Sequence, residues 1–355
     1  MNLHLLVPSL FWPDATLTGI YRDLPLPALE NLLAKSTCTD DDTKASERSE
    51  GLEAWLCRAF NVTRQQDWPV APITLTLDGD GKVKVQDEYW IRADPVHLHI
   101  EHNQILLADS RVFRISSQEA DQLTELLNQH FAANGQEMVF LPLWPDRWYV
   151  RAAKIPPAKT HLLGEVANKS INELLPFGEN AGLWSGLFNE IQMLLHEHPL
   201  NQLREARGEP AINSVWFWGG GSMPKPIVSH YTHVWSNHML AGSLAGSLAA
   251  ASGADYAQLP ADAAACLQCT TSGNQLAVLD VLLGKAQYAD AYGWRESLKN
   301  LEQNWFEPSL AMLKQGRIDQ LTVTAIGETR TRNFTARTGD LRKFWRKTKP
   351  ISTYL

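Results

Sequence analysis

Two arginine-bearing runs have the residue types and spacing to bind an anion. Arg204 and Arg207 lie one helical turn apart in LREARGEP (203–210), so their guanidinium groups can converge on one phosphate or carboxylate. Arg147 belongs to a second cationic run, DRWYVRAAK (146–154). The alternative for both runs is that their charged side chains lie on the solvent-exposed face of a helix and bind no ligand. We expect the three arginines to line an anion pocket.

A run of three glycines follows an aromatic segment in NSVWFWGGGSMPKP (213–226). The run lacks the Lys-Ser/Thr pair of a P-loop and the G-x-G-x-x-G spacing of a dinucleotide-binding turn. Glycines after a strand allow the backbone to approach an anion or another chain segment closely. Gly219, Gly220 and Gly221 are therefore candidate ligand contacts, and the alternative is a tight turn where the chain re-enters a sheet.

Histidines, cysteines and serines give weaker signals. His230, His233 and His238 are spaced by three and five residues, which would suit zinc on a helix, but no acid or cysteine lies near them in sequence. We favour scattered histidines without a metal. The single C-x-x-C pair, Cys266 and Cys269, falls in an Ala-rich stretch rather than at the strand-to-helix start that redox use requires. A G-x-S-x-G nucleophile motif is absent, so we expect no catalytic residue.

The overall composition excludes several classes of protein. The 355 residues carry a net charge of −7 and a pI near 5.9, whereas dedicated nucleic-acid binders are usually basic. No run of 18 apolar residues predicts a membrane span, and the first residues lack the features of a signal peptide. Four cysteines do not make a secreted disulfide framework. We expect a soluble, cytoplasmic, bacterial protein that binds neither membrane nor nucleic acid.

A basic, aromatic segment, LRKFWRKTK (341–349), stands near the end of this acidic chain. Its five positive charges surround Phe344 and Trp345, so an acidic partner or nucleic acid is one candidate for docking there. The interpretation that we favour packs Phe344 and Trp345 onto the core and leaves the basic side chains in water. On that interpretation Trp345 is buried.

Hydrophobic periodicity predicts the elements that must position these residues. Apolar residues at helical spacing predict helices over 26–36, 116–135 and 183–198, and a long helix over 294–316 that bends at Pro308. Alternation around an Asp-Gly turn predicts a β-hairpin in PITLTLDGDGKVKV (72–85). Further strands are expected over 4–10, 212–218 and 320–327.

Strands and helices alternate at both ends of the chain, and the middle has the pattern of a separate α+β region. This arrangement is typical of an α/β domain that is interrupted by an insertion. We place the α/β core at residues 1–70 and 212–355 and the insertion at residues 71–211.

The stretch LLHEHPLNQLREARGEPAINSVWFWGGGSMPKP (194–226) resembles the archaeal-type, cofactor-independent phosphoglycerate mutases. RVFRISSQEADQLTELLNQHF (111–131) is similar to the helix that opens the inserted domain of that family. WFWGGG and LRKFWRK also resemble bacterial RpfE-type proteins, which are named as regulatory proteins. The resemblance implies a three-layer, alkaline-phosphatase-like core with an inserted substrate domain. It matches Arg147, Asn201, Arg204 and the glycine run to the substrate cleft of the family.

The resemblance also implies a site with two divalent metals, held by Asp and His, and a phosphoryl-carrying serine. The residues of this chain depart from that site. Pro8-Ser9 stands where the first strand of the family ends in Asp-Gly, and Ile326-Gly327 stands where a late strand ends in Asp-His. Asp290 matches one further ligand, but Gly293 or Trp294 falls near the His that should follow. Apolar residues and glycine do not coordinate Mg²⁺, Mn²⁺ or Zn²⁺, so we expect no metal cofactor.

Two functions follow as hypotheses. The first is a phosphoglycerate-mutase-like protein that does no catalysis, binds a phosphorylated small molecule or a regulatory protein partner, and acts in regulation. The alternative is an active 2,3-bisphosphoglycerate-independent phosphoglycerate mutase or phosphatase. Such an enzyme would need a relocated Mn, Mg or Zn site that uses His230, His233, His238 and nearby acids.

Overall fold

The computed structural model divides the chain into two compact units. Unit 1 comprises Met1–Leu56 and Val228–Leu355, and unit 2 comprises Cys57–Ile227. The structure describes residues 1–14, 16–40, 51–83, 85, 88–152, 156–237, 240–269 and 272–354. The polar segment 41–50 and His238 lie outside these described residues.

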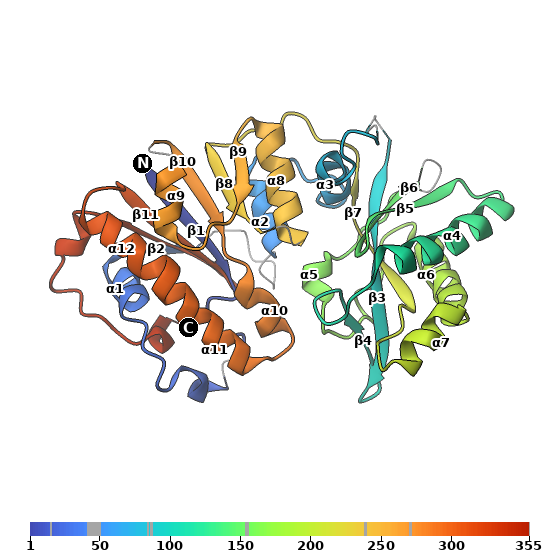
Figure 1. Cartoon of the computed structure of the whole chain (residues 1–355), viewed down its shortest axis with the longest axis horizontal. Helices are drawn as coiled ribbons and strands as arrows, with labels where there is room; N and C mark the ends of the chain where they lie inside the picture. The colour runs from blue at the N-terminus through green and yellow to red at the C-terminus, as the bar shows by residue number, and fades with distance from the viewer. Residues whose placement is uncertain are drawn as a thin grey trace. The chain divides into compact units, whose positions relative to one another are not determined.

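Unit 1 is built on a seven-stranded sheet in the order β2-β12-β11-β1-β10-β8-β9 (Figure 1). The pairings from β11 through β1, β10 and β8 to β9 are parallel, whereas β12 and β2 pair in antiparallel fashion at one side. The strands are β1 (Asn2–Pro8), β2 (Thr37–Asp40), β8 (His233–Ser236), β9 (Asp255–Gln258), β10 (Asn274–Val278), β11 (Gln320–Ile326) and β12 (Thr331–Arg337).

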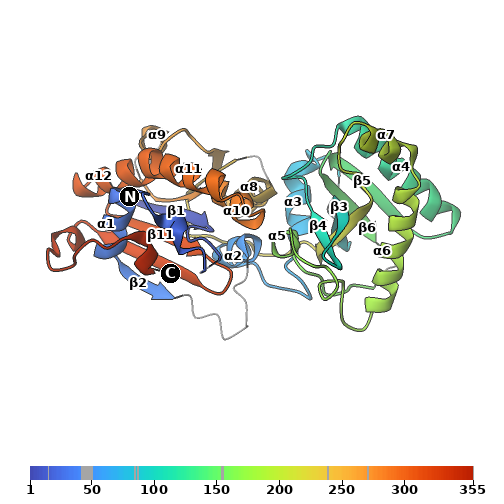
Figure 2. The same cartoon turned by 90° about the horizontal axis from the view of Figure 1, so that it is seen from below.

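Helices cover both faces of this sheet. Figures 1 and 2 show α9 to α12 along one face, where the odd-numbered residues of β1 are buried. The ring of Trp55 in α2 contacts His4, an even-numbered residue of β1, from the other face. The helices that belong wholly or partly to unit 1 are α1 (Pro27–Lys35), α2 (Leu52–Ala59), α8 (Leu240–Ser252), α9 (Ala263–Cys269), α10 (Val281–Gln287), α11 (Ala291–Leu301) and α12 (Glu307–Lys314).

The long helix predicted over 294–316 is present but interrupted. A π-helical turn, η2 (Glu302–Phe306), joins α11 to α12, and Pro308 lies in the first turn of α12. A proline tolerates that position because the N–H that it lacks has no partner in a regular first turn. The predicted helix is therefore confirmed, its irregular turn lies at 302–306, and the bend at Pro308 stays a prediction.

Unit 2 contains a five-stranded sheet whose long central strand, β3, pairs with β4, β6 and β7. The cluster that holds Phe131, Trp184 and Phe217 lies on one face, where α4 and α6 pack. α3 packs on the other face through Ala71 and Leu75. The elements are α3 (Val70–Asp78), β3 (Trp90–Glu101), β4 (Gln104–Ala108), α4 (Ser117–Ala133), β5 (Met138–Trp144), β6 (Arg147–Ala152), α5 (Leu163–Val166), α6 (Ala181–His196), α7 (Pro199–Ala206) and β7 (Ser214–Gly221).

The helix predicted over 116–135 is confirmed with its start signal. Ser116 accepts a hydrogen bond from the backbone N–H of Glu119, and the Glu119 carboxylate accepts one from the backbone N–H of Ser116. This capping box satisfies two N–H groups that a helix start otherwise leaves free. Apolar spacing predicts a buried stripe of Leu123, Leu126, Leu127 and Phe131; Leu123, Leu127 and Phe131 are fully buried, and Leu126 is half-buried.

The predicted β-hairpin over 72–85 is wrong. Residues Val70–Asp78 form α3, and Gly81 adopts a φ of +69° in the turns that follow. Val70, Ala71 and Ile73 are completely buried, so the tertiary environment overrides the preference of Thr and Ile for strands. Alternation over so few residues fits one side of a short buried helix as well as it fits a strand.

The observed unit boundaries, 56/57 and 227/228, differ from the expected 70/71 and 211/212. β7 was placed with the core, but its backbone pairs with β3 in the sheet of unit 2. Val215 and Phe217 face the α4–α6 side, and Trp218 lies on the α3 side beside Arg92. A strand belongs to the sheet that satisfies its hydrogen bonds, and the sequence does not indicate which sheet that is.

The expected burial of Phe344 and Trp345 is also wrong. Phe344 is 84% exposed and Trp345 is 65% exposed. Ile351, in the short 3₁₀ turn Ile351–Tyr354, instead enters the core of unit 1 beside Leu33. Ile351 therefore anchors the end of the tail, and Phe344 and Trp345 are exposed.

A buried ion pair occupies the α3 face of the unit 2 sheet. Arg92 donates two hydrogen bonds to Asp94 Oδ1 and one to Oδ2, at 2.7–3.0 Å. Asp94 also accepts from the indole N–H of Trp218 at 2.8 Å and from the backbone N–H of Trp148 at 3.1 Å. The guanidinium lies over the rings of Tyr149 and Trp218. One carboxylate therefore connects β3, β6 and β7.

We expect Asp94→Ala to lower the free energy of unfolding by about 3 to 5 kcal/mol, because it leaves the Arg92 charge buried without compensation. Chemical denaturation followed by tryptophan fluorescence measures this loss. Asp80→Ala is the matched control, since Asp80 pairs with Lys82 on the surface, where both side chains are more than 80% exposed. Equal stability of the two variants would contradict the structural role of Asp94.

Candidate functional site

The carboxyl ends of β1 and β11 lie side by side in unit 1. Pro8 is in register with Ile326, and the backbone N–H of Ser9 donates to the carbonyl of Ile326 at 2.8 Å. Ligands of α/β proteins bind at the carboxyl ends of parallel strands. The two segments in which the resemblance places metal ligands are therefore adjacent, as a shared site requires.

An aromatic cluster covers these strand ends. Trp294 of α11 is fully buried, and its indole N–H donates to the carbonyl of Ser9 at 2.9 Å. Trp12 and Tyr21 meet the Trp294 ring edge-on, with centroids at 5.6 and 5.8 Å. The cluster presents rings rather than carboxylates or imidazoles to the strand ends.

Asp290 matches a metal ligand of the family by resemblance, but its carboxylate has structural partners here. Oδ2 accepts from Lys285 Nζ at 2.9 Å, and Oδ1 accepts from the backbone N–H of Gly293 at 2.8 Å, which caps α11. The bond from Lys285 and then the bond from Gly293 hold the pKa of Asp290 below its usual range. Together with Pro8, Ser9, Ile326 and Gly327, this donor set does not fit a two-metal centre.

His4, in the middle of β1, is the centre of a polar chain on the α2 face. Its Nε2 lies 2.6 Å from Thr324 Oγ1, its Nδ1 lies 2.6 Å from the hydroxyl of Tyr231, and Thr324 Oγ1 donates to Asn333 Oδ1. Because the Thr324 proton is directed to Asn333, Nε2–H of a neutral His4 donates to Oγ1 and Nδ1 accepts from Tyr231. Burial, and then the nearby His230, lower the pKa of His4 to about 3.

The other histidines do not form a metal site with acids. His233 Nε2 lies 3.3 Å from Asp255 Oδ2, and the His230 ring stacks on Tyr231 with centroids 4.1 Å apart. No group of three or more His, Cys, Asp or Glu side chains is arranged to hold a metal within the described part of the chain. The absence of a metal cofactor nevertheless stays a prediction, because His238 is not among those residues.

Arg204 and Arg207 do meet, at a cavity of about 970 Å³ in unit 2 that α4, α7 and the segment before α4 line. Both donate to Glu119 Oε1, at 3.0 and 3.1 Å, and Arg207 also donates to Glu209. Burial opposes ionisation of Glu119, but the bonds from Ser116 and Arg204 outweigh it and lower its pKa. The two guanidinium groups thus share a carboxylate that an incoming anion would have to displace or bridge.

Arg204 and Arg207 differ in exposure. The side chain of Arg204 is 1% exposed and also donates to the carbonyls of Pro210 and Arg114, whereas that of Arg207 is 51% exposed. Arg204 therefore braces the turn after α7, and Arg207 is the member of the pair that a ligand can reach.

The remaining predicted site residues lie apart from this pair. Arg147 is buried and forms a bidentate ion pair with Asp78 of α3, with bonds of 2.8 and 2.9 Å. Asn201 bonds the carbonyls of Leu195 and Ile212 and the backbone N–H of Ile212, which ties α7 to the start of β7. Neither side chain lines the cavity of Arg204 and Arg207.

The glycine run forms the end of β7, and the space beside it is filled by protein. A Cβ on Gly219 would lie 2.9 Å from Cβ of Val70, and a Cβ on Gly221 would lie 2.7 Å from Cβ of Pro69. A Cβ on Gly220 would overlap the hydroxyl of Tyr89. The glycines thus allow the start of α3 to pack closely against β7, so the close approach is to another chain segment. Contact between the glycines and a ligand stays a prediction.

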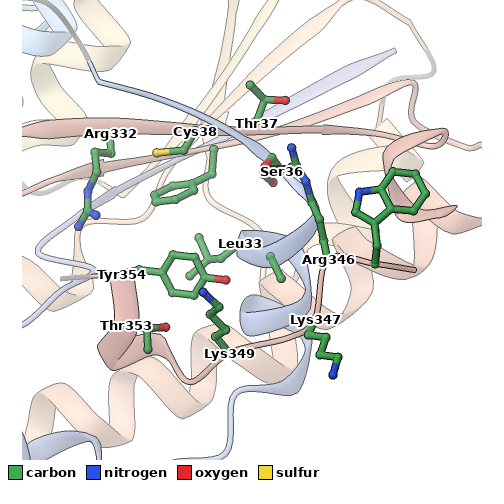
Figure 3. A pocket seen from close by; sticks show the side chains of 13 residues that line it. Leu33, Ser36, Thr37, Cys38, Arg332, Arg346, Lys347, Lys349, Thr353 and Tyr354 are labelled. Atoms are coloured by element: carbon green, nitrogen blue, oxygen red, sulfur yellow. Dashed lines mark hydrogen bonds between the residues drawn. The ribbon is translucent and has the colours of Figure 1, made fainter. Parts of the chain in front are cut away.

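The sequence did not indicate a second cavity, which is in unit 1. It has a volume of about 760 Å³ and lies between α1, β2, β12 and the tail (Figure 3). The basic tail was visible in the sequence, but Cys38, Arg332 and Tyr354 come from distant segments and gave no signal of their own. The antiparallel pairing of β2 with β12 brings Cys38 and Arg332 together, and Tyr354 joins them through its ring contact with Phe334.

Comparison with known proteins relates unit 2 to one enzyme family. The sequence model of the 2,3-bisphosphoglycerate-independent phosphoglycerate mutases matches residues 82–201. The matched segment lies entirely within unit 2, includes α4 and α6, and ends three residues into α7. The chain is thus related to these mutases through unit 2.

Individual relatives agree with that assignment. A 2,3-bisphosphoglycerate-independent phosphoglycerate mutase from Methanosarcina barkeri is 34% identical over 128 residues, which cover 36% of this chain and 31% of the relative. The corresponding protein of Methanosarcina mazei is 29% identical over 127 residues, 35% of this chain and 31% of the relative. The chain thus matches about a third of the length of these relatives.

Similarity in fold extends over nearly the whole chain. The PH0037 protein from Pyrococcus horikoshii superposes with a TM-score of 0.54 at 12% identity, over 95% of this chain and 87% of that protein. The expected fold class, an alkaline-phosphatase-like α/β core with an inserted α+β domain, is confirmed. In the described part of the chain, no helix has the length and apolar character that crossing a bilayer requires.

The pKa of His4 predicts a pH dependence of stability. Between the unfolded pKa of 6.5 and the folded pKa of about 3, only the unfolded chain binds the proton. The contribution of His4 to the free energy of unfolding is therefore fully present above pH 6.5 and decreases as the pH is lowered toward 3. The slope reaches about 1.4 kcal/mol per pH unit for one proton. We expect His4→Gln to remove this slope in denaturation curves measured from pH 7 to pH 4.

His102→Gln, at a side chain that is 91% exposed, should keep the wild-type slope. The comparison of variants is needed because burial raises the pKa of Asp67 to about 6, which changes stability in the opposite direction over the same range. Identical slopes in wild type and His4→Gln would contradict the neutral, hydrogen-bonded His4.

Proposed function

We propose that this chain is a phosphoglycerate-mutase-like protein without two-metal chemistry, which binds a phosphorylated metabolite and acts in regulation. The observation that carries the proposal is the composition of the joined strand ends. Backbone pairing brings residues 8–9 and 326–327 together, and the residues there are Pro, Ser, Ile and Gly under a buried indole. Such a site offers no set of charged oxygen or nitrogen ligands for a divalent ion.

The relation of unit 2 to the mutases supports the binding part of the proposal. In that unit Arg204 and Arg207 line a cavity large enough for a phosphorylated small molecule. The resemblance of WFWGGG and LRKFWRK to RpfE-type regulatory proteins supports a regulatory role, in the cytoplasm of a bacterium and with a protein partner. An active mutase is the competing function, because the relatives carry that name.

We expect purified protein to contain no stoichiometric Mg, Mn or Zn and to show no interconversion of 2- and 3-phosphoglycerate with any of these ions added. Elemental analysis and a coupled mutase assay measure both properties. Two metal ions per chain, together with turnover, would establish the competing enzyme. Failure of turnover to respond to His230→Ala and His233→Ala would then exclude a relocated histidine site.

We expect 3-phosphoglycerate to bind at the cavity of unit 2, and Arg207→Glu to weaken that binding about tenfold, since one charge-assisted hydrogen bond contributes roughly 1.5–3 kcal/mol. Isothermal titration calorimetry measures the change. Arg207 is the residue to replace because it is half exposed, whereas replacement of the buried Arg204 would also unfold its surroundings. Lys314→Glu, on the exposed side of α12 in unit 1, is the charge-matched control. Unchanged affinity in Arg207→Glu would remove this cavity from the proposal.

A further inference from the structure

We propose that the groove between α1, β2, β12 and the C-terminal tail of unit 1 binds a nucleoside phosphate. The groove is separate from the cavity of Arg204 and Arg207, and the proposal does not rest on the function proposed above. It rests on the charge, the aromatic surface and the size of one cavity.

The lining of the groove is cationic and includes no carboxylate among the described residues. It has a volume of about 760 Å³, and its charged members are Arg332, Arg346, Lys347 and Lys349. The protein as a whole has a net charge of −7. Four cations around one cavity in an acidic chain are a specific complement to an anion.

Carbonyl groups rather than acids hold Arg346, and also Lys35 beside the groove. Arg346 Nη1 donates to the carbonyls of Lys35 and Ser36, at 3.2 and 2.7 Å. Lys35, only 9% exposed, donates through Nζ to the carbonyls of Lys343 and Arg346, at 2.7 and 2.6 Å. Carbonyls orient a cation without neutralising it, so the charge stays available to a phosphate.

Asp40 lies opposite Arg332 in the pairing of β2 with β12, whereas Asp340 and Glu30 have partners other than the lining cations. Asp340 pairs with Lys343 and accepts from the backbone N–H of Arg337, and the bond from Lys343 lowers its pKa. Glu30 accepts from the backbone N–H of Ile351 at 3.0 Å. This contrasts with the cavity of unit 2, where Glu119 and Glu209 bond the arginines directly.

Aromatic side chains give the groove planar surfaces next to its charges. Figure 3 shows Tyr354 and Lys349 between Arg332 on one side and Arg346 on the other. Phe334 and Trp345 also line the cavity, and Trp345 is 65% exposed although it is a large apolar residue. A base gains stacking energy on such rings while its phosphates meet the cations.

The size of the groove distinguishes among anions. Sites for small molecules have volumes of about 300–1,000 Å³, which suits a mononucleotide and exceeds the need of a bare phosphate. A long polynucleotide is disfavoured because the rest of the acidic surface repels it. A nucleoside phosphate satisfies charge, rings and volume together.

The test is calorimetric titration of the full chain with ATP. Separate titrations with pyrophosphate and with adenosine measure the binding of the phosphate part and of the nucleoside part alone. We expect ATP to bind more tightly than either part, with an affinity that falls as salt is raised. Lys347→Glu combined with Lys349→Glu should weaken ATP at least tenfold. Trp345→Ala should weaken ATP several-fold and leave the melting temperature unchanged, because its side chain faces water.

Two charge controls separate this groove from other surfaces. Lys314→Glu on α12 and Arg207→Glu in unit 2 should leave ATP binding as in wild type. Absence of ATP binding at millimolar concentration would overturn the proposal, as would binding that the double charge reversal does not change. If an oligonucleotide of eight nucleotides or an acidic peptide binds more tightly than ATP, the groove is a site for a macromolecule, and the proposal is likewise overturned.

Discussion

The parallel pairing of β1 with both β10 and β11 is the constraint on which unit 1 depends. Parallel strands bring their carboxyl ends to one edge, so the residues after β1 and β11 must be neighbours whatever their identity. In this chain those neighbours are joined by a backbone hydrogen bond from Ser9 to Ile326 and covered by Trp294. The geometry that could assemble a metal centre is retained, and the side chains turn it into an aromatic packing surface.

The buried arginines of unit 2 and two cations at the groove of unit 1 have different kinds of partner. In unit 2, Arg92, Arg147 and Arg204 each bond a carboxylate, and all three are almost completely buried. Desolvating a guanidinium is costly, so each buried arginine needs its acid and is committed to structure. In unit 1, Lys35 and Arg346 bond carbonyls instead. An arginine in the sequence therefore says little about anion binding until its partners are known.

Sequence patterns predicted the structure correctly where interactions between neighbouring residues decide it. The Ser116 cap of α4, the burial of Leu123, Leu127 and Phe131, and the position of Pro308 in the first turn of α12 each depend on residues within a few positions of one another. The hairpin over 72–85 failed because burial of Val70 and Ile73 outweighed a weak strand pattern. The boundary at 212 failed because β7 obtains its hydrogen bonds from β3, more than a hundred residues earlier.

By itself, the sequence determined the α/β class, the helices over 26–36, 116–135, 183–198 and 294–316, and the absence of acidic or imidazole residues at 8–9 and 326–327. Those properties follow from composition and short-range periodicity. Only the tertiary structure decided that Asn201 braces α7, that the glycine run packs on α3, and that Ile351 rather than Trp345 enters the core. Each of these outcomes depends on which distant segment fills the space beside a residue, and contacts between distant segments leave no periodic pattern in the chain.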